Sequence, residues 1–144
     1  MGIIDSLSIS ASALTAERTR MDVTAENLAN AQTTRGADGQ PYKRKVVVLQ
    51  EDAPRSFGST LDGVMNAKGS RVRVAQIAQD TTPNRLVYDP GHPDADPRGY
   101  VSMPNVQPVT EMVDLISASR GYEANVTVMQ TAKQMFTKTL EILR

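Results

Sequence analysis

The sequence predicts an α+β fold with long N- and C-terminal helices, packed as a coiled-coil-like inner domain, and a small β-rich, irregular middle segment. Apolar residues recur every three or four positions at both ends of the chain, which is the period of a helix. All 8 prolines lie between residues 41 and 108, and 7 of the 9 glycines lie between residues 36 and 99. Both ends are therefore nearly free of helix breakers, and the middle is rich in them.

The first predicted helix covers about residues 3–31. Its apolar residues step by three and four along the chain, as in a heptad seam rather than a broad amphipathic stripe. At ~1.5 Å per residue this helix would be roughly 40 Å long. The large apolar members of the seam are Ile4, Leu7, Leu14, Met21 and Leu28.

The second predicted helix covers about residues 107–143. Pro108 suits the first turn of a helix, and Glu111 suits its electropositive N-terminal end. Gly121 weakens a helix by about 1 kcal/mol relative to alanine. The apolar and aromatic members of this seam are Met112, Leu115, Tyr122, Val126, Met129, Phe136, Leu140 and Leu143.

The middle segment is predicted to contain short strands joined by turns. Its candidate strands are Lys43–Leu49, Arg71–Val74 and Leu86–Tyr88, and its candidate turns are 36–39 and 62–63. The proline-rich stretch 89–98 favours irregular structure. We therefore divide the chain into an N-terminal helical segment 1–34, a middle segment 35–106 and a C-terminal helical segment 107–144.

The apolar spacing does not decide which helices the two seams pack against. One interpretation pairs the two helices only with each other, as a hairpin within the chain. A two-helix hairpin buries little, and apolar residues beside the seams, such as Ile9, Val113 and Val128, widen the exposed faces, which favours helices from other chains. The polar residues Arg18, Ser119 and Lys133 interrupt the seams and either set register or project at the rim.

Composition argues against enzymatic chemistry. The chain has no cysteine, a single histidine and a formal net charge of zero, so it lacks thiolate sites and the bulk charge that recruits nucleic acid. His92 lies near Asp89, Asp94 and Asp96, which suggests either a hydrolytic metal site or a set of turn-forming residues. We favour turns, and predict no catalytic residue, metal or cofactor. The basic run 43–45 is predicted to be a solvated strand edge.

No segment of the sequence is typical of membrane insertion or classical secretion. The first basic residue is Arg18, whereas a secretory signal begins with a positive stretch before its apolar run. The run Val46–Leu49 is far shorter than a bilayer span. We expect a chain without a lipid-embedded segment.

Residues 25–34, Ala-Glu-Asn-Leu-Ala-Asn-Ala-Gln-Thr-Thr, are expected to end the first helix. The two asparagines, three positions apart, also offer amides to a subunit contact. This run resembles the N-terminal signature of the rod, hook and filament-type axial proteins of the bacterial flagellum. The chain departs from that signature after Gly36, where no aromatic residue follows.

The second half of the chain resembles the same family. The resemblance is carried by Tyr88–Asp96, Gly99–Val101, Pro104–Val106, Glu111–Ile116 and Ser119–Asn125, and the first of these points to the proximal-rod type. On this resemblance the family motif residues are Asn27, Asn30, Thr33, Glu111, Arg120 and Asn125.

The resemblance implies a structural subunit of the proximal rod that stacks helically through its terminal helices and forms part of the drive shaft and export-channel wall. Its implied partners are copies of itself, other rod proteins, the adaptor between ring and rod, and the flagellar type III export apparatus. It would lie in the periplasm-spanning rod after export without a cleaved signal peptide. The alternative is a free homo-oligomeric helical-bundle adaptor.

Overall fold

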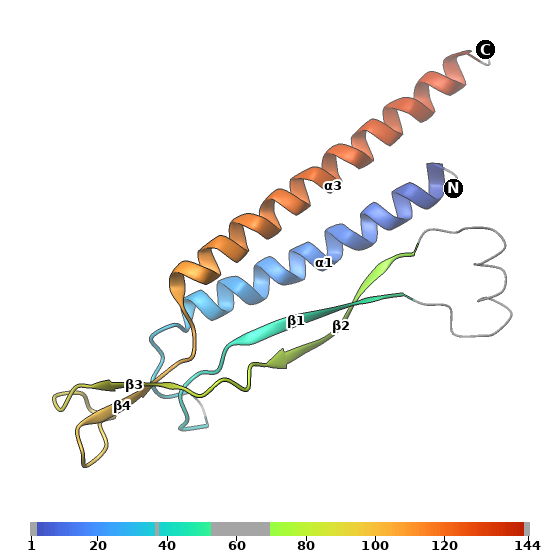
Figure 1. The fold of residues 1–144 in the computed structure, drawn as a ribbon. Coiled ribbons are helices and arrows are strands. Elements are labelled where there is room, and N and C mark those ends of the chain that lie inside the picture. The colour runs from blue at the N-terminus through green and yellow to red at the C-terminus, as the bar shows by residue number, and fades with distance from the viewer. Residues whose placement is uncertain (1–2, 37, 53–69, 143–144) are drawn as a thin grey trace, which may run out of the picture. The chain divides into compact units, whose positions relative to one another are not determined.

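The computed structural model describes residues 3–36, 38–52 and 70–142 and has the predicted α+β composition (Figure 1). A long helix lies at each end of the described chain, with short strands between them. In order, the elements are α1 (Ile3–Ala29), β1 (Lys45–Glu51), β2 (Val72–Gln79), β3 (Arg85–Tyr88), β4 (Tyr100–Met103) and α3 (Pro108–Ile142).

Both helices begin and end close to the predicted positions. α1 ends at Ala29, where the Asn30 side chain turns back and donates to the carbonyl of Glu26 (2.9 Å). Asparagine stops a helix in this way because its amide competes with the backbone bonds. α3 begins at Pro108, which tolerates the first helical position because no backbone N–H is needed there.

The strands form two separate two-stranded sheets, β1–β2 and β3–β4. Backbone bonds from Asp80 to Arg44 and from Asp52 to Arg71 show that β1 and β2 run antiparallel. β3 and β4 are also antiparallel, with Tyr88 opposite Tyr100.

Three predicted strands are confirmed with shifted bounds, and β4 was not predicted. β1 begins two residues later than expected, and β2 continues to Gln79. At the predicted turn 36–39, the backbone N–H of Gly39 donates to the carbonyl of Gly36 (3.0 Å) and Gly39 has φ +71°, whereas the candidate turn at 62–63 lies outside the described residues.

The described chain forms two compact units, and each draws on both terminal helices and on the middle segment. One contains 3–19, 48–52, 70–76 and 118–142, and the other contains 20–47 and 77–117. In the first unit the hydroxyl of Ser12 accepts a bond from the backbone N–H of Val72 (3.2 Å). There too, a Cβ added at Gly121 would lie 3.3 Å from Glu17 Cδ, so α1 and α3 approach closely at this glycine.

Candidate functional site

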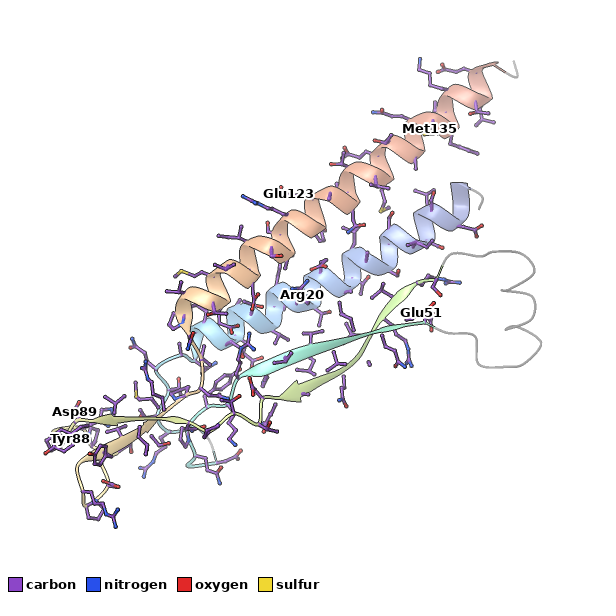
Figure 2. The ribbon with its side chains drawn as sticks, in the orientation of Figure 1. Arg20, Glu51, Tyr88, Asp89, Glu123 and Met135 are labelled. Carbon is purple, nitrogen blue, oxygen red and sulfur yellow. The ribbon has the colours of Figure 1, made fainter. Side chains whose placement is uncertain are left out.

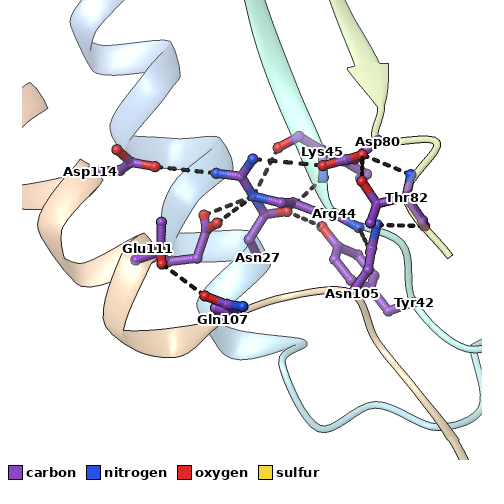
Figure 3. A network of polar contacts seen from close by, with 11 residues as sticks. Asn27, Tyr42, Arg44, Lys45, Asp80, Thr82, Asn105, Gln107, Glu111 and Asp114 are labelled. Atoms are coloured by element: carbon purple, nitrogen blue, oxygen red, sulfur yellow. Dashed lines mark hydrogen bonds and ion pairs between the residues drawn. The ribbon is translucent and has the colours of Figure 1, made fainter. Parts of the chain in front are cut away.

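Asn27, near the end of α1, uses the full bonding capacity of its side-chain amide (Figure 3). Its side chain is 1% exposed. Nδ2 donates to the carbonyl of Lys45 (2.8 Å) and to Glu111 Oε2 (3.0 Å). Oδ1 accepts from the Tyr42 hydroxyl (2.9 Å) and the Lys45 backbone N–H (2.9 Å). Two donors and two lone pairs are all that an amide offers, so Asn27 joins α1, α3 and the start of β1 with no group left over.

Glu111, in the first turn of α3, is a buried carboxylate with a partner on each oxygen. It is 1% exposed, Arg44 Nε donates to Oε1 at 2.6 Å, and Asn27 donates to Oε2. A buried charge is tolerated only when it is paired and hydrogen-bonded. The N-terminal turn of a helix adds further attraction for the negative charge. Glu111 is therefore held by Arg44, Asn27 and its own helix.

Arg44 faces three carboxylates. Besides Glu111, it lies 3.2 Å from Asp114 Oδ2 and 3.8 Å from Asp80 Oδ2. The hydrogen bond to Glu111 raises the pKa of Arg44, opposed by partial burial and aided by the three negative charges. Bonds from the hydroxyl and backbone N–H of Thr82, followed by the charge of Arg44, lower the pKa of Asp80.

Tyr42 lies in an environment that disfavours its ionised form. Burial, followed by the negative charges of Glu26 and Glu111, raises the pKa of Tyr42 to about 12. Lys45 pairs with Glu26, and its Nζ lies 5.8 Å from the centroid of the Tyr42 ring. The Tyr42 hydroxyl therefore stays a hydrogen-bond donor to Asn27 throughout the neutral pH range.

Asn105, just before α3, fixes the backbone around this network. Its Oδ1 accepts from the backbone N–H of Arg44 (2.7 Å), and its Nδ2 donates to the carbonyl of Thr82 (3.1 Å). We name the network the junction cluster, which consists of Asn27, Tyr42, Arg44, Lys45, Asn105 and Glu111.

The chemistry of the junction cluster is that of a structural clamp. A cavity of about 150 Å³ lies beside Asn27, Arg44 and Glu111, and another of about 360 Å³ lies beside Tyr42 and Lys45. The polar side chains of the cluster bond to one another or to nearby backbone, which holds segments distant in sequence together.

The motif asparagines bond within the chain. The sequence left open a contact of their amides with a neighbouring subunit, but all four side-chain bonds of Asn27 lie within its own chain. Asn30 also bonds locally, and its Oδ1 accepts from the Thr33 hydroxyl (3.2 Å).

The two remaining motif residues lie on α3, outside the junction cluster. Asn125 donates to the carbonyl of Gly121 one turn earlier in its own helix (2.8 Å). Arg120 is exposed. Among the six predicted motif residues, the structure therefore joins Asn27 to Glu111 across the fold and Asn30 to Thr33 locally.

The predicted seam residues are half-buried or exposed in the single chain, and the buried helix positions are taken by small or polar residues and by Val23. Ser10, Ala16 and Ala118 are buried. Of the residues that interrupt the seams, Arg18 and Lys133 are exposed, and Ser119 is half-buried. The half-buried seam residues are Leu7, Leu14, Met21, Leu28, Leu115, Tyr122, Val126 and Met129, the exposed ones are Met112, Phe136 and Leu140, and the side chains of Ile4 and Leu143 lie outside the description.

A broader apolar surface lies on the first part of α3. Val109, Met112, Val113 and Ile116 are 75%, 51%, 60% and 55% exposed. At about 3.6 residues per turn, these four residues share one side of the helix, away from Glu111. We name them the α3 outer stripe. Further along the helix, Val128, Met135, Phe136 and Leu140 are also exposed; Figure 2 labels Met135. Of these eight residues, only Met112, Phe136 and Leu140 belonged to the predicted seam.

The acidic loop around His92 is held by its own backbone contacts. His92 Nδ1 accepts from the backbone N–H of Asp94 (3.1 Å), and Asp94 pairs with Arg35 at 3.4 Å. Asp89 and Asp96 accept backbone N–H bonds within the loop. Among the described residues, no three histidine or carboxylate side chains are grouped to bind a metal. These contacts favour the turn-forming interpretation.

Sequence reasoning missed the role of Arg44. It lies in the basic run predicted to be a solvated strand edge, but its side chain is only 25% exposed and points to Glu111. The available signal was indirect: an acidic residue buried at a helix start requires a basic partner. The sequence does not say which basic residue supplies it.

Neither described helix is long and apolar enough to cross a lipid bilayer.

Comparisons with known proteins cover both ends of the chain. Residues 7–37 match the family model described as flagella basal body rod protein, and residues 98–142 match the C-terminal model of the flagellar basal body rod FlgEFG proteins. The chain is 50% identical to the flagellar basal-body rod protein FlgC of Bacillus subtilis over 99% of both chains. It is 45% identical to that of Borreliella burgdorferi (100% of this chain, 99% of the relative) and 46% identical to that of Escherichia coli (99% and 98%).

Proposed function

The chain belongs to the FlgC family of flagellar basal-body rod proteins, and we propose that it assembles into the rod through the exposed apolar surfaces of its terminal helices. Its role is structural, as a component of the basal body. The alternative of a free homo-oligomeric adaptor is not favoured by these relatives.

The α3 outer stripe is the observation that carries this proposal. Its four apolar side chains are at least half exposed and adjacent on one helix side. Contiguous exposed apolar surface of this kind marks interaction sites in soluble proteins. At ~25 cal/mol per Å² of buried apolar area, covering the stripe with a neighbouring helix favours association, before the entropic costs are subtracted.

The predicted seam residues of α3 other than Met112 lie on another side of the helix, the side that carries Glu111. Leu115, Tyr122, Val126 and Met129 are half-buried in the single chain, so part of each side chain is available to a neighbour. We propose that these accessible parts also contact neighbouring helices, where the polar Ser119 and the exposed Lys133 set register.

The proposal is tested by placing charges in the stripe. In the double variant Val113→Asp/Ile116→Asp we expect an intact fold, because both positions are exposed, but no rods containing the chain. Circular dichroism checks the fold, and electron microscopy with immunoblotting of isolated basal bodies checks assembly. Gln76→Asp/Gln79→Asp is the matched control, since both positions are exposed and lie on β2, outside the helices. Normal rods from the double variant would refute the proposal.

We also propose which proteins neighbour the chain in the rod and by which route it is exported. The neighbours would be copies of the chain, other rod proteins and the ring–rod adaptor, and export would use the flagellar type III apparatus without cleavage. Family membership supports this proposal. Mass spectrometry of the protein from isolated basal bodies tests the route, and the expected mass is that of the whole 15.6 kDa chain. A shortened N-terminus would contradict it.

A further inference from the structure

The β3–β4 hairpin carries an exposed apolar face that is separate from the apolar surfaces of the terminal helices. In its register, Leu86 and Tyr88 on β3 share one face with Tyr100 on β4, and Val87 and Val101 share the other. Val101 is 2% exposed, so its face is turned inward. Leu86, Tyr88 and Tyr100 are 68%, 65% and 43% exposed. We name these three residues the hairpin aromatic face.

The aromatic side chains of this face are held in position by the chain itself. The Tyr88 and Tyr100 rings meet edge to face with centroids 5.3 Å apart. Gly99, at φ +81°, leaves room for the Tyr88 ring, since a Cβ there would lie 2.9 Å from Tyr88 Cε2. Figure 2 shows Tyr88 beside Asp89 at the end of β3. Side chains fixed in advance lose less entropy on binding, and tyrosine is enriched at protein interfaces.

The charges around the face select the kind of partner. The exposed charged residues of the hairpin are Arg85, Arg98, Asp89 and Asp96, which sum to zero, while Asp94 is paired with Arg35. A neutral surface with both signs does not suit nucleic acid or an acidic membrane. It suits a protein surface without net charge, and this chain itself has a net charge of zero.

The size of the face limits how its partner is held. An aromatic side chain buries about 150–250 Å², so the exposed parts of the three residues amount to roughly 300–400 Å². A stable free complex buries about 800 Å² per partner. The face alone is too small to capture a free protein, but a contact of this size contributes once the partner is already held nearby.

We propose that the hairpin aromatic face docks against a second copy of this chain in the assembled rod. This inference rests on the proposed function, because the terminal helices supply the tether that the small contact needs. The helices hold neighbouring subunits together, and the hairpin adds a second contact between copies that resists their sliding or rotation.

Site-specific photo-crosslinking tests this contact. A photoreactive phenylalanine analogue replaces Tyr88, and basal bodies that contain the chain by immunoblot are irradiated. The expected product is a covalent dimer of about twice the 15.6 kDa chain mass, identified by mass spectrometry and absent from the irradiated monomer. Crosslinking only to a different protein, or no crosslink in basal bodies that contain the chain, would overturn the inference and leave the proposed function standing. Absence of the chain from wild-type basal bodies would overturn both.

A second variant keeps the test decisive if the analogue prevents incorporation. Leu86→Ser/Tyr88→Ser is expected to enter rods whose chain content falls several-fold after mild heating, since both positions are exposed and their loss leaves the inward face intact. Gln76→Ser, at an exposed position of β2, is the matched control. Equal retention of the double variant and the control would contradict docking by this face.

Discussion

Arg44 Nε lies 2.6 Å from Glu111 Oε1, and this ion pair ties the residue before β1 to the first turn of α3. The two side chains differ in exposure, 25% for Arg44 and 1% for Glu111. Removing the arginine therefore leaves a buried carboxylate without its cation, and an unpaired buried charge strongly destabilises a fold.

Arg44→Met is expected to lower the free energy of unfolding by about 3–5 kcal/mol, the usual cost of leaving a buried charge unpaired. Urea unfolding followed by circular dichroism measures it. Arg120→Met, at an exposed arginine, should stay within about 0.5 kcal/mol of wild type. The double variant Arg44→Met/Glu111→Leu should lose less than the sum of the two single variants, because neither charge is then left alone. Equal losses for Arg44→Met and Arg120→Met would contradict the role of this pair.

Asn27→Ala is expected to destabilise the chain more than Asn30→Ala. The first change removes one partner each from Glu111, Tyr42, the Lys45 carbonyl and the Lys45 backbone N–H, and an unsatisfied buried group costs about 1–3 kcal/mol. The Asn30 side chain is partly exposed and bonds only to the Glu26 carbonyl and the Thr33 hydroxyl, so its loss should cost about 1 kcal/mol, the net contribution of a typical hydrogen bond. Similar unfolding midpoints for the two variants would show that Asn27 is not the centre of the cluster.

The raised pKa of Tyr42 predicts that the free energy of unfolding falls in strong alkali. Its pKa is about 12 in the folded chain, against an ordinary value of 10.0. A raised pKa favours the neutral form in the fold, so the stabilisation is complete below pH 10 and is lost between pH 10 and 12. The difference between the tyrosinate absorbance titrations of wild type and Tyr42→Phe isolates this residue. We expect a midpoint near 12 in the folded chain and near 10 in urea, and a folded midpoint of 10 would disprove the burial argument.

Gly99→Ala is expected to destabilise the β3–β4 hairpin, whereas Gly91→Ala is not. At Gly99 the backbone is left-handed and a Cβ would meet Tyr88 at 2.9 Å, which together cost about 1–3 kcal/mol. At Gly91 an added Cβ would make an ordinary contact at 3.6 Å with Asp89. Hydrogen exchange of the β3 and β4 amides reads out the difference. Unchanged protection in Gly99→Ala would mean that the hairpin relaxes around the alanine.

The terminal helices could be predicted because their signals are local. Apolar spacing, the absence of glycine and proline from residues 3–35, and Pro108 at a helix start each act within a few residues. β4 was missed for the same reason. It is four residues long and lies between Gly99 and Pro104, so only its pairing with β3 makes it a strand.

The candidate site was predicted only in part. Glu111 and Asn27 were singled out by motif resemblance, yet nothing in their neighbourhoods in the sequence predicted that they bond to each other. Arg44 was interpreted as solvated because the residues beside it in the sequence do not indicate which carboxylate it faces in the fold. The outward position of Val109 and Met135 was likewise missed, since periodicity defines faces of a helix but not which of them meets the rest of the chain.

The sequence by itself determined the two helices, the broken middle between them and the family, because periodicity, breaker placement and motif residues are written along the chain. The tertiary structure alone decided which helix face turns inward. Glu111 and Asn27 are buried because Arg44 and Tyr42, distant in sequence, satisfy their charge and hydrogen bonds, and the apolar side chains of the α3 outer stripe are left on the exposed side of the helix, away from Glu111.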